Sequence, residues 1–172
     1  MNQKIKNALI SVSDKGELIS ILKILKKYNI NIISSGGTHS SIRKLGYSCT
    51  EISKYTGFKE MLDGRVKTLH PKIHAGILHD RFNKKHQGEM NKQKFPSIDL
   101  IIVNFYPFQK IVIESKNSKK IIENIDIGGP TMVRSAAKNF NNVTIITNKN
   151  DYGNLIKELN KNNGCTSLRF RE

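Results

Sequence analysis

One stretch of the chain limits the fold more than any other. Residues 99–108, DLIIVNFYPF, form a continuous apolar run. A strand without polar alternation is typical of one that is covered on both faces. Shorter runs of the same kind predict strands at 7–13, 30–38, 47–53 and 142–148. The chain therefore predicts a sheet that is buried between two layers of helices.

Segments with helical spacing separate these runs. In residues 17–28 the apolar positions Leu18, Ile21, Leu22 and Leu25 recur as on one face of a helix. Further helices are predicted at 39–46, where Gly46 ends the helix, at 131–139, and at 151–161, where Asp151 is the N-cap. Strands that alternate with helices favour an α/β fold with a parallel sheet. Residues 54–98 break the rhythm and are expected to be a long irregular segment, which in a compact domain is usually functional.

The length of 172 residues suits one domain spanning 1–172. No run of 18 apolar residues predicts a membrane helix, and the N-terminus lacks the cleavage site of a signal peptide. Two cysteines make no disulfide framework. Cys49 is expected in a core strand and Cys165 in a frayed tail. We expect a cytoplasmic protein.

The net charge of +15 raises the question of a nucleic-acid partner. Lysine accounts for 23 of the 29 basic residues, and the lysines are scattered over the chain. No arginine cluster with interleaved aromatic residues is present. We therefore expect no nucleic-acid partner and no membrane partner.

Hydroxyl groups and glycines follow two of the predicted strands. SSGGT (34–38) offers Ser35, Gly37 and Thr38 at the start of a helix, and SVSDK (11–15) adds three more polar side chains: Ser11, Ser13 and Lys15. In parallel sheets ligands bind beyond the carboxyl ends of the strands, and a helix N-terminus favours anions. These segments predict a phosphate site. Alone, SSGGT is equally consistent with a simple N-capped turn.

Two further segments carry chemistry. NIDIGGP (124–130) places Asp126 before a glycine pair, and the helix after it has Arg134 and Lys138 on one face. GRVKTLHP (64–71) gathers cations, a hydroxyl and an imidazole in the region without a regular pattern. A metal site is suggested by the spacing of three histidines, His70, His74 and His79. Pro71 and the lack of an acidic partner argue against a metal.

Five segments together resemble the N-terminal IMP cyclohydrolase domain of the bifunctional purine-biosynthesis protein PurH. They are ALISVSDK, ISSGGT, TGFKEMLDGRVKTLHPKIHAGIL, VNFYPF and ENIDIGGPTMVRSAAKN. The resemblance covers about residues 5–152. It implies a methylglyoxal-synthase-like fold, a three-layer α/β/α sandwich with a mainly parallel sheet. In the family the first helix usually opens with SDKTG, whereas this chain has SDKGE, with Gly16 and Glu17.

The resemblance also implies an activity, the dehydrative ring closure of 5-formamidoimidazole-4-carboxamide ribonucleotide (FAICAR) to IMP. This is the last step of de novo purine biosynthesis, and it uses no metal and no organic cofactor. The family protein normally continues into an AICAR transformylase domain. We expect no such domain in this chain and no formyltransferase activity from it alone. The substrate FAICAR and the product IMP are the expected partners. Formation of a homodimer is a further possibility.

Site residues follow from the resemblance, position by position. The catalytic group maps onto Lys67, Tyr106, Asp126 and Lys138. The phosphate and ribose contacts map onto Ser11, Ser13, Lys15, Ser35, Gly37 and Thr38. Arg65, Lys67 and Thr68 would contact substrate, and Asn104 and Gly128 would lie against the heterocycle.

These residue types suit the chemistry. A cation such as Lys67 would stabilise charge on the formyl oxygen. Asp126 with Lys138, and Tyr106 with Lys67, would move the protons, and the division of the two steps between the pairs is open. Two alternatives share the fold: a methylglyoxal synthase-type lyase, and a non-catalytic nucleotide-binding regulatory domain. The first lacks GRVKTLHP and IDIGGP as they stand here, and the second would not need all four catalytic residues.

Overall fold

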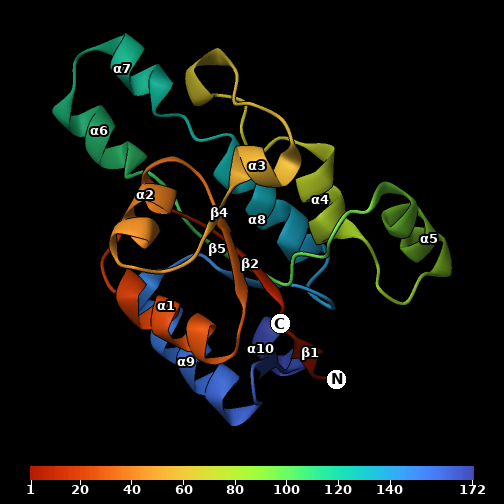
Figure 1. Cartoon of the computed structure of the whole chain (residues 1–172). Coiled ribbons are helices and arrows are strands. Elements are labelled where there is room, and N and C mark those ends of the chain that lie inside the picture. Colours follow the sequence, from red (N-terminus) through yellow and green to blue (C-terminus); the bar gives the residue numbers. More distant parts are fainter.

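Five parallel strands form the centre of the computed structural model, which describes all residues from 1 to 172 (Figure 1). Their order in the sheet is β4-β3-β2-β5-β6. The middle strand β2 pairs with β3 on one side and with β5 on the other, so that Ala8 lies between Ile32 and Leu100. The bounds are β2 Asn7–Val12, β3 Asn31–Ser34, β4 Thr50–Glu51, β5 Leu100–Asn104 and β6 Thr144–Ile146.

Helices cover both faces of this sheet, as the apolar runs predict. One face packs against α1 (Leu18–Lys27), α2 (Gly36–Lys44) and α9 (Tyr152–Lys161). The other packs against α3 (Ile52–Thr56), α4 (Pro71–Leu78) and α8 (Gly128–Lys138). Two separate apolar cores result, one on each side of the sheet. The expected three-layer α/β/α architecture is confirmed.

Several predicted elements differ from the observed ones. The strand expected over 47–53 is reduced to Thr50–Glu51 at the sheet edge, and α3 begins directly after it. Cys49 lies outside any strand and packs partly buried against the first core, where burial raises the pKa of its thiol to about 11. Asp151 occupies the N-cap position of α9 as expected, but its side chain makes no capping hydrogen bond.

The region 54–98 is not irregular. It contains a 3-10 turn, η1 (Leu62–Gly64), followed by α4 and by α5 (Lys84–Gln93). Pro71 is the first residue of α4, where a missing N–H costs nothing, and His70 caps the helix with its ring. The apolar run 99–108 likewise ends as a strand at Asn104. From Phe108 the chain forms α6 (Phe108–Glu114) and then α7 (Ser118–Glu123), which project from the body (Figure 1).

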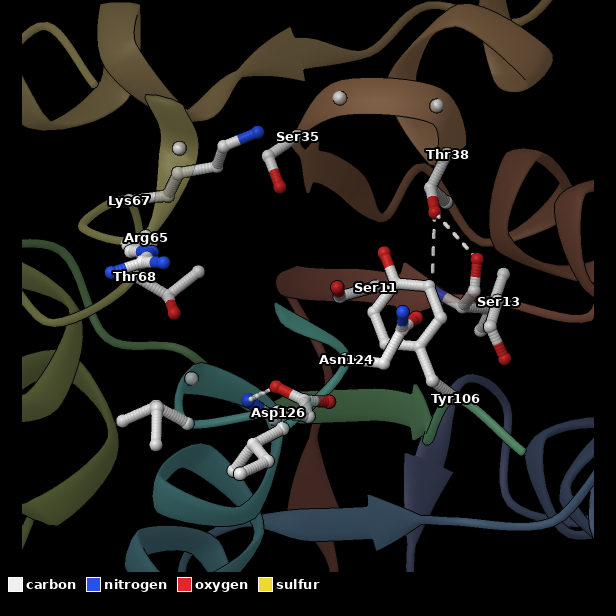
Figure 2. Close-up of a pocket in the computed structure, with 18 of the residues that line it drawn as sticks. Ser11, Ser13, Ser35, Thr38, Arg65, Lys67, Thr68, Tyr106, Asn124 and Asp126 are labelled. Atoms are coloured by element: carbon white, nitrogen blue, oxygen red, sulfur yellow. Dashed lines mark hydrogen bonds between the residues drawn. The ribbon is translucent and has the colours of Figure 1, made fainter. Parts of the chain in front are cut away.

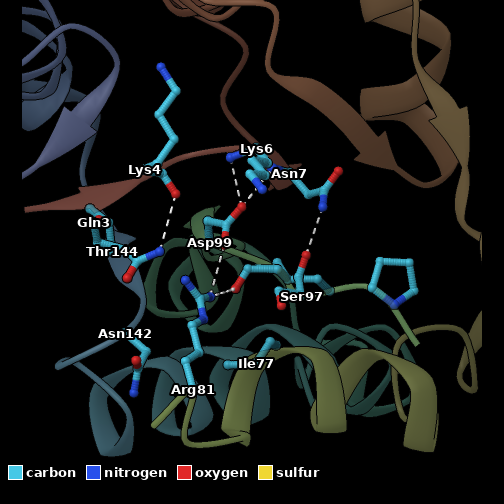
Figure 3. Close-up of polar contacts among 12 residues, drawn as sticks. Gln3, Lys4, Lys6, Asn7, Ile77, Arg81, Ser97, Asp99, Asn142 and Thr144 are labelled. Atoms are coloured by element: carbon cyan, nitrogen blue, oxygen red, sulfur yellow. Dashed lines mark hydrogen bonds and ion pairs between the residues drawn. The ribbon is translucent and has the colours of Figure 1, made fainter. Parts of the chain in front are cut away.

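A buried ion pair lies at the N-terminal ends of the central strands (Figure 3). The side chain of Asp99 is 4% exposed and lies 2.9 Å from Arg81. Its other oxygen accepts hydrogen bonds from the backbone N–H groups of Lys6 at 2.7 Å and Asn7 at 2.8 Å. This carboxylate therefore ties the segment after α4 to the starts of β2 and β5.

The N-terminal and C-terminal segments of the chain also meet at this end of the sheet. β1 (Gln3–Lys4) pairs antiparallel with β7 (Cys165–Thr166), and α10 (Leu168–Arg171) follows. The prediction that Cys165 lies in a frayed tail is wrong, because it belongs to this strand pair. The side chain of Arg171 is buried here and donates to the carbonyl oxygens of Phe140, Asn141 and Thr166. None of the helices is both long and apolar enough to cross a membrane.

Candidate active site

A cleft of about 680 Å³ opens at the carboxyl ends of β3, β2 and β5 (Figure 2). Polar residues that follow these three strands form one wall. The segment 63–68 forms a second wall, and the segment from 122 to the start of α8 forms a third. The cleft has the size of a small-molecule site, and its position is the one that parallel sheets favour.

The N-terminus of α2 forms an anion cradle in this cleft. The first N–H groups of the helix, from Gly36 to Thr38, have no acceptor within the helix. Gly36 has a φ of +53°, a conformation that favours glycine. The Lys15 Nζ atom lies 3.8 Å from the position of a Cβ at Gly37, and the Lys67 Nζ atom lies 3.6 Å from that of a Cβ at Gly36. Free N–H groups, a helix dipole and two ammonium groups therefore meet at one point.

Not every hydroxyl near the cradle is free. The Thr38 hydroxyl donates to the Val12 carbonyl at 2.9 Å and accepts from the Val12 N–H at 3.1 Å, so it fixes α2 to the end of β2. Asn104 has a similar function. Its Oδ1 accepts from the N–H groups of Ser13 at 2.6 Å and Asp14 at 3.1 Å, and its Nδ2 donates to the Asp14 carbonyl at 3.1 Å. Thr38 and Asn104 both line the cleft, but the Thr38 hydroxyl and the Asn104 carboxamide are engaged in hydrogen bonds that fix the end of β2 and the loop after it.

Asp126 faces the cleft from the entrance of α8, across from the cradle (Figure 2). Its Oδ1 accepts a hydrogen bond from the Gly129 N–H at 2.9 Å. A Cβ at Gly129 would collide with this carboxylate, and a Cβ at Gly128 would collide with the Thr68 hydroxyl. The glycine pair therefore lets Asp126 fold back over the helix and lets the segment of Thr68 approach it.

The segment around GRVKTLHP is a small, tight hairpin. Met61 and Val66 form a β-bridge, and the turn between them holds Leu62, Asp63 and Gly64 at φ values of +54°, +53° and +87°. Positive φ values at two non-glycine residues store strain, which proteins concentrate at functional sites. The hairpin carries Lys67 toward Ser35 of the cradle (Figure 2).

Ion pairs engage both cations of this hairpin. Lys67 lies 2.9 Å from Glu60, which stands beside it on the opposite strand. Arg65 binds Glu123, the last residue of α7, through both Nε and Nη2. This bond lowers the pKa of Glu123. Arg65 thus ties the hairpin to the projecting α6–α7 segment.

The cleft brings together thirteen of the fourteen residues predicted for the site, all except Lys138. They are Ser11, Ser13, Lys15, Ser35, Gly37, Thr38, Arg65, Lys67, Thr68, Asn104, Tyr106, Asp126 and Gly128. Lys138 is exposed at the last residue of α8, whose first residues line the cleft. The helix rise places it about 15 Å further along the axis. Among the lining residues without a predicted role are Asp63, Glu123, Asn124 and Gly129, which all lie in the two segments TGFKEMLDGRVKTLHPKIHAGIL and ENIDIGGPTMVRSAAKN that carry the resemblance.

The three histidines of the considered metal site have structural hydrogen bonds instead. His70 Nδ1 accepts from the Lys72 N–H at 3.1 Å. His74 Nδ1 lies 3.0 Å from the Ser135 hydroxyl of α8, and His79 Nε2 lies 3.1 Å from Ser97. Burial lowers the pKa of both His74 and His79.

This fold and this cleft are those of a methylglyoxal-synthase-like domain. The model of the MGS-like domain family matches residues 17–131, and the chain belongs to that family. A solved structure titled "Crystal structure of ForH" superposes with a TM-score of 0.85 at 29% identity, covering 96% of this chain and 85% of that one.

Among curated proteins, the chain is similar to bifunctional purine biosynthesis proteins named PurH. That of Clostridium perfringens (strain SM101) is 47% identical over 167 residues, which cover 97% of this chain and 33% of that protein. That of Rhodospirillum rubrum is 46% identical, covering 97% of this chain and 32% of the protein. The chain spans about a third of the length of these relatives. The matches confirm the resemblance to PurH and are consistent with its N-terminal domain.

Proposed function

We propose that this chain is an IMP cyclohydrolase, which closes the purine ring of FAICAR to give IMP and water. One observation carries the proposal. A single cleft holds an anion cradle at one end and a carboxylate, Asp126, across from it, and the phenol of Tyr106 lines the same cleft. The similarity to PurH supports the purine substrate.

In this proposal the substrate phosphate sits on the N-terminus of α2. The N–H groups of Gly36 to Thr38 donate to its oxygens, and Lys15 supplies a positive charge beside Gly37. Ser11 and Ser35 line the same end of the cleft, and the hydrogen bonds of the protein leave their hydroxyls free to bind phosphate or ribose. The heterocycle then extends toward Gly128 and Asp126.

Ring closure moves two protons onto the formyl oxygen. The carboxamide nitrogen attacks the formyl carbon within the same molecule and loses a proton, and the formyl oxygen takes up a proton to become a hydroxyl. This hydroxyl takes up a second proton and leaves as water, while the formamido nitrogen loses its proton to form the C=N bond of the ring. We assign the proton acceptor to Asp126 and the protonation of the leaving hydroxyl to Tyr106. A cleft that holds the substrate in the reactive conformer contributes to the rate as well, because the attack is intramolecular.

Lys67 supplies the remaining positive charge. Its ammonium lies beside the cradle and pairs with Glu60. We propose that the flexible side chain turns toward the heterocycle when substrate binds and stabilises negative charge that develops on the formyl oxygen. Lys138 has no part in this proposal, because it is exposed at the far end of α8.

An absorbance assay with purified chain tests the proposal. We expect turnover of FAICAR to IMP, no release of methylglyoxal from dihydroxyacetone phosphate, and no formylation of AICAR by 10-formyltetrahydrofolate. Turnover of dihydroxyacetone phosphate would favour the lyase. Binding of IMP without turnover of either substrate would favour the regulatory domain.

A further inference from the structure

The hairpin beside the cradle carries acidic groups as well as cations. The bridge between Met61 and Val66 aligns Glu60 with Lys67, and their charged atoms lie 2.9 Å apart. Glu60 remains half exposed in this pair and stands behind Lys67, whose ammonium lies 3.6 Å from the position of a Cβ at Gly36 in the cradle. Asp63, in the turn of the same hairpin, lines the cleft.

The cradle itself has a limited positive charge. Lys15 makes no ion pair there, and its ammonium donates only to the Ser13 carbonyl at 3.3 Å. Lys67 is the second cation, but Glu60 already neutralises it in part. Together with the partial charge of the helix N-terminus, these groups match one phosphate rather than two.

Lys67 differs from Lys15 in having a carboxylate on the side away from the cradle. Lys67 stands between the cradle and Glu60. If the nucleoside extends from the cradle toward Asp126, an additional phosphate on the other side has to pass Lys67 and approach Glu60. The negative charges of the second phosphate and of the Glu60 carboxylate repel each other at close range, and this repulsion weakens binding of the ligand with two phosphates.

From this arrangement we propose that Glu60 is a specificity-determining residue that restricts the cleft to nucleoside monophosphates. The carboxylate weakens the hold of Lys67 on any second phosphate and repels that phosphate directly. This inference rests on the proposed function, since it takes the α2 cradle as the phosphate site, but it concerns the choice of ligand and not the chemical step.

Equilibrium binding of IMP and IDP to the full chain tests the proposal. Wild type should bind IMP more tightly than IDP. Glu60→Gln should raise the affinity for IDP by about two- to fivefold, the scale of an exposed charge interaction, and the affinity for IMP by less. Glu60→Ala should act in the same way, because the loss of charge is the cause. Glu114→Gln is the matched control, since Glu114 also pairs with a lysine, Lys110, on the exposed face of α6. It should change neither affinity.

Several results would overturn the proposal. One is equal affinity of wild type for IMP and IDP, and another is an equal shift of both affinities in Glu60→Gln. A selective gain in Glu60→Gln that Glu60→Ala does not share would also contradict it. Selective binding of IMP without turnover of FAICAR would reject the proposed enzyme activity and leave this inference standing, so the two failures are distinguishable.

Discussion

At the scale of single residues, Asp126 combines two functions. Its Oδ1 accepts from the Gly129 N–H at 2.9 Å and so caps the entrance of α8, while the carboxylate faces the cleft. A carboxamide oxygen caps a helix about as well as a carboxylate does, but a carboxamide cannot accept a proton. Asparagine at this position therefore separates the stability contribution from the chemical one.

We predict that Asp126→Asn lowers turnover of FAICAR by about 10²–10⁴-fold, the usual contribution of a general acid or base. The melting temperature and the affinity for IMP should stay close to those of wild type. Steady-state kinetics, equilibrium binding and thermal melting on the same preparation measure all three. Near-normal turnover would show that Asp126 is only a helix cap.

Residue roles could be predicted only in part. The resemblance predicts Thr38 and Asn104 for the site, and both line the cleft. It could not show that their polar groups bind Val12 and the Ser13–Asp14 backbone, since such contacts depend on atomic positions. Lys138 illustrates a second limit. Helical spacing shows which face a residue occupies, but the distance from the site depends on where the helix begins.

At the scale of the elements, the entrance of α1 is strained. Glu17, the N-cap, has a φ of +61° and makes no side-chain capping hydrogen bond. The left-handed conformation costs a residue with a Cβ about 1–2 kcal/mol. The related family sequences that begin this helix with SDKTG have glycine at this position, which can adopt such a φ without strain.

Glu17→Gly should therefore stabilise the chain, by about 1 kcal/mol after the entropy lost by glycine is included. For a chain of this size that corresponds to a rise of roughly 2–4 °C in the melting temperature. Glu17→Ala is the matched control, because it removes the same carboxylate but keeps the Cβ. An equal gain in both variants would show that charge, not backbone strain, is the cause.

The contact between α4 and α8 should depend on pH. Burial lowers the pKa of His74 below its ordinary value of 6.5. A lowered pKa means that the folded state favours the neutral ring, so this stability is present above pH 6.5 and is lost as pH falls through the folded pKa. Denaturant unfolding at pH 7.5 and at pH 5 should show a smaller loss of stability in His74→Gln than in wild type. An unchanged loss would exclude His74 as a source of the pH dependence.

Element boundaries followed from the sequence where apolar spacing was strong. β2, α1 and β6 lie inside the predicted ranges. α5 was missed because its ten residues bury only Met90, so no apolar stripe marks it. α6 was missed because its first residue, Phe108, ends the apolar run that contains β5, and the three apolar residues 111–113 are too short a run to distinguish a strand from a helix.

At the scale of the whole molecule, the net charge of +15 is the dominant electrostatic feature. The cleft uses only a few of the cations, and acidic partners already engage Lys67 and Arg65. The remaining lysines are scattered, and scattered charge gives attraction to polyanions without a specific site.

We predict weak binding to random duplex DNA that decreases steeply with salt, since such binding depends on the release of counterions. Fluorescence anisotropy between 50 and 200 mM salt, with the nucleotide IMP as competitor, measures it. IMP should not displace DNA, because the cleft is not the source of the attraction. Tight binding that persists at 200 mM salt would revive a nucleic-acid function.

The strand order has a consequence for the synthesis of the chain. β2 lies in the middle of the sheet, yet its partner β5 follows far later, so that Val12 pairs with Asn104. At translation rates of about 5–20 residues per second, the ribosome needs roughly 5–20 s to deliver that partner. During this time β2, α1 and β3 can associate, but one edge of β2 stays open to other nascent chains. The apolar strand β5 covers this edge of β2 and so removes an aggregation-prone edge from the growing polypeptide, and β6 then pairs with β5 as the last strand of the sheet.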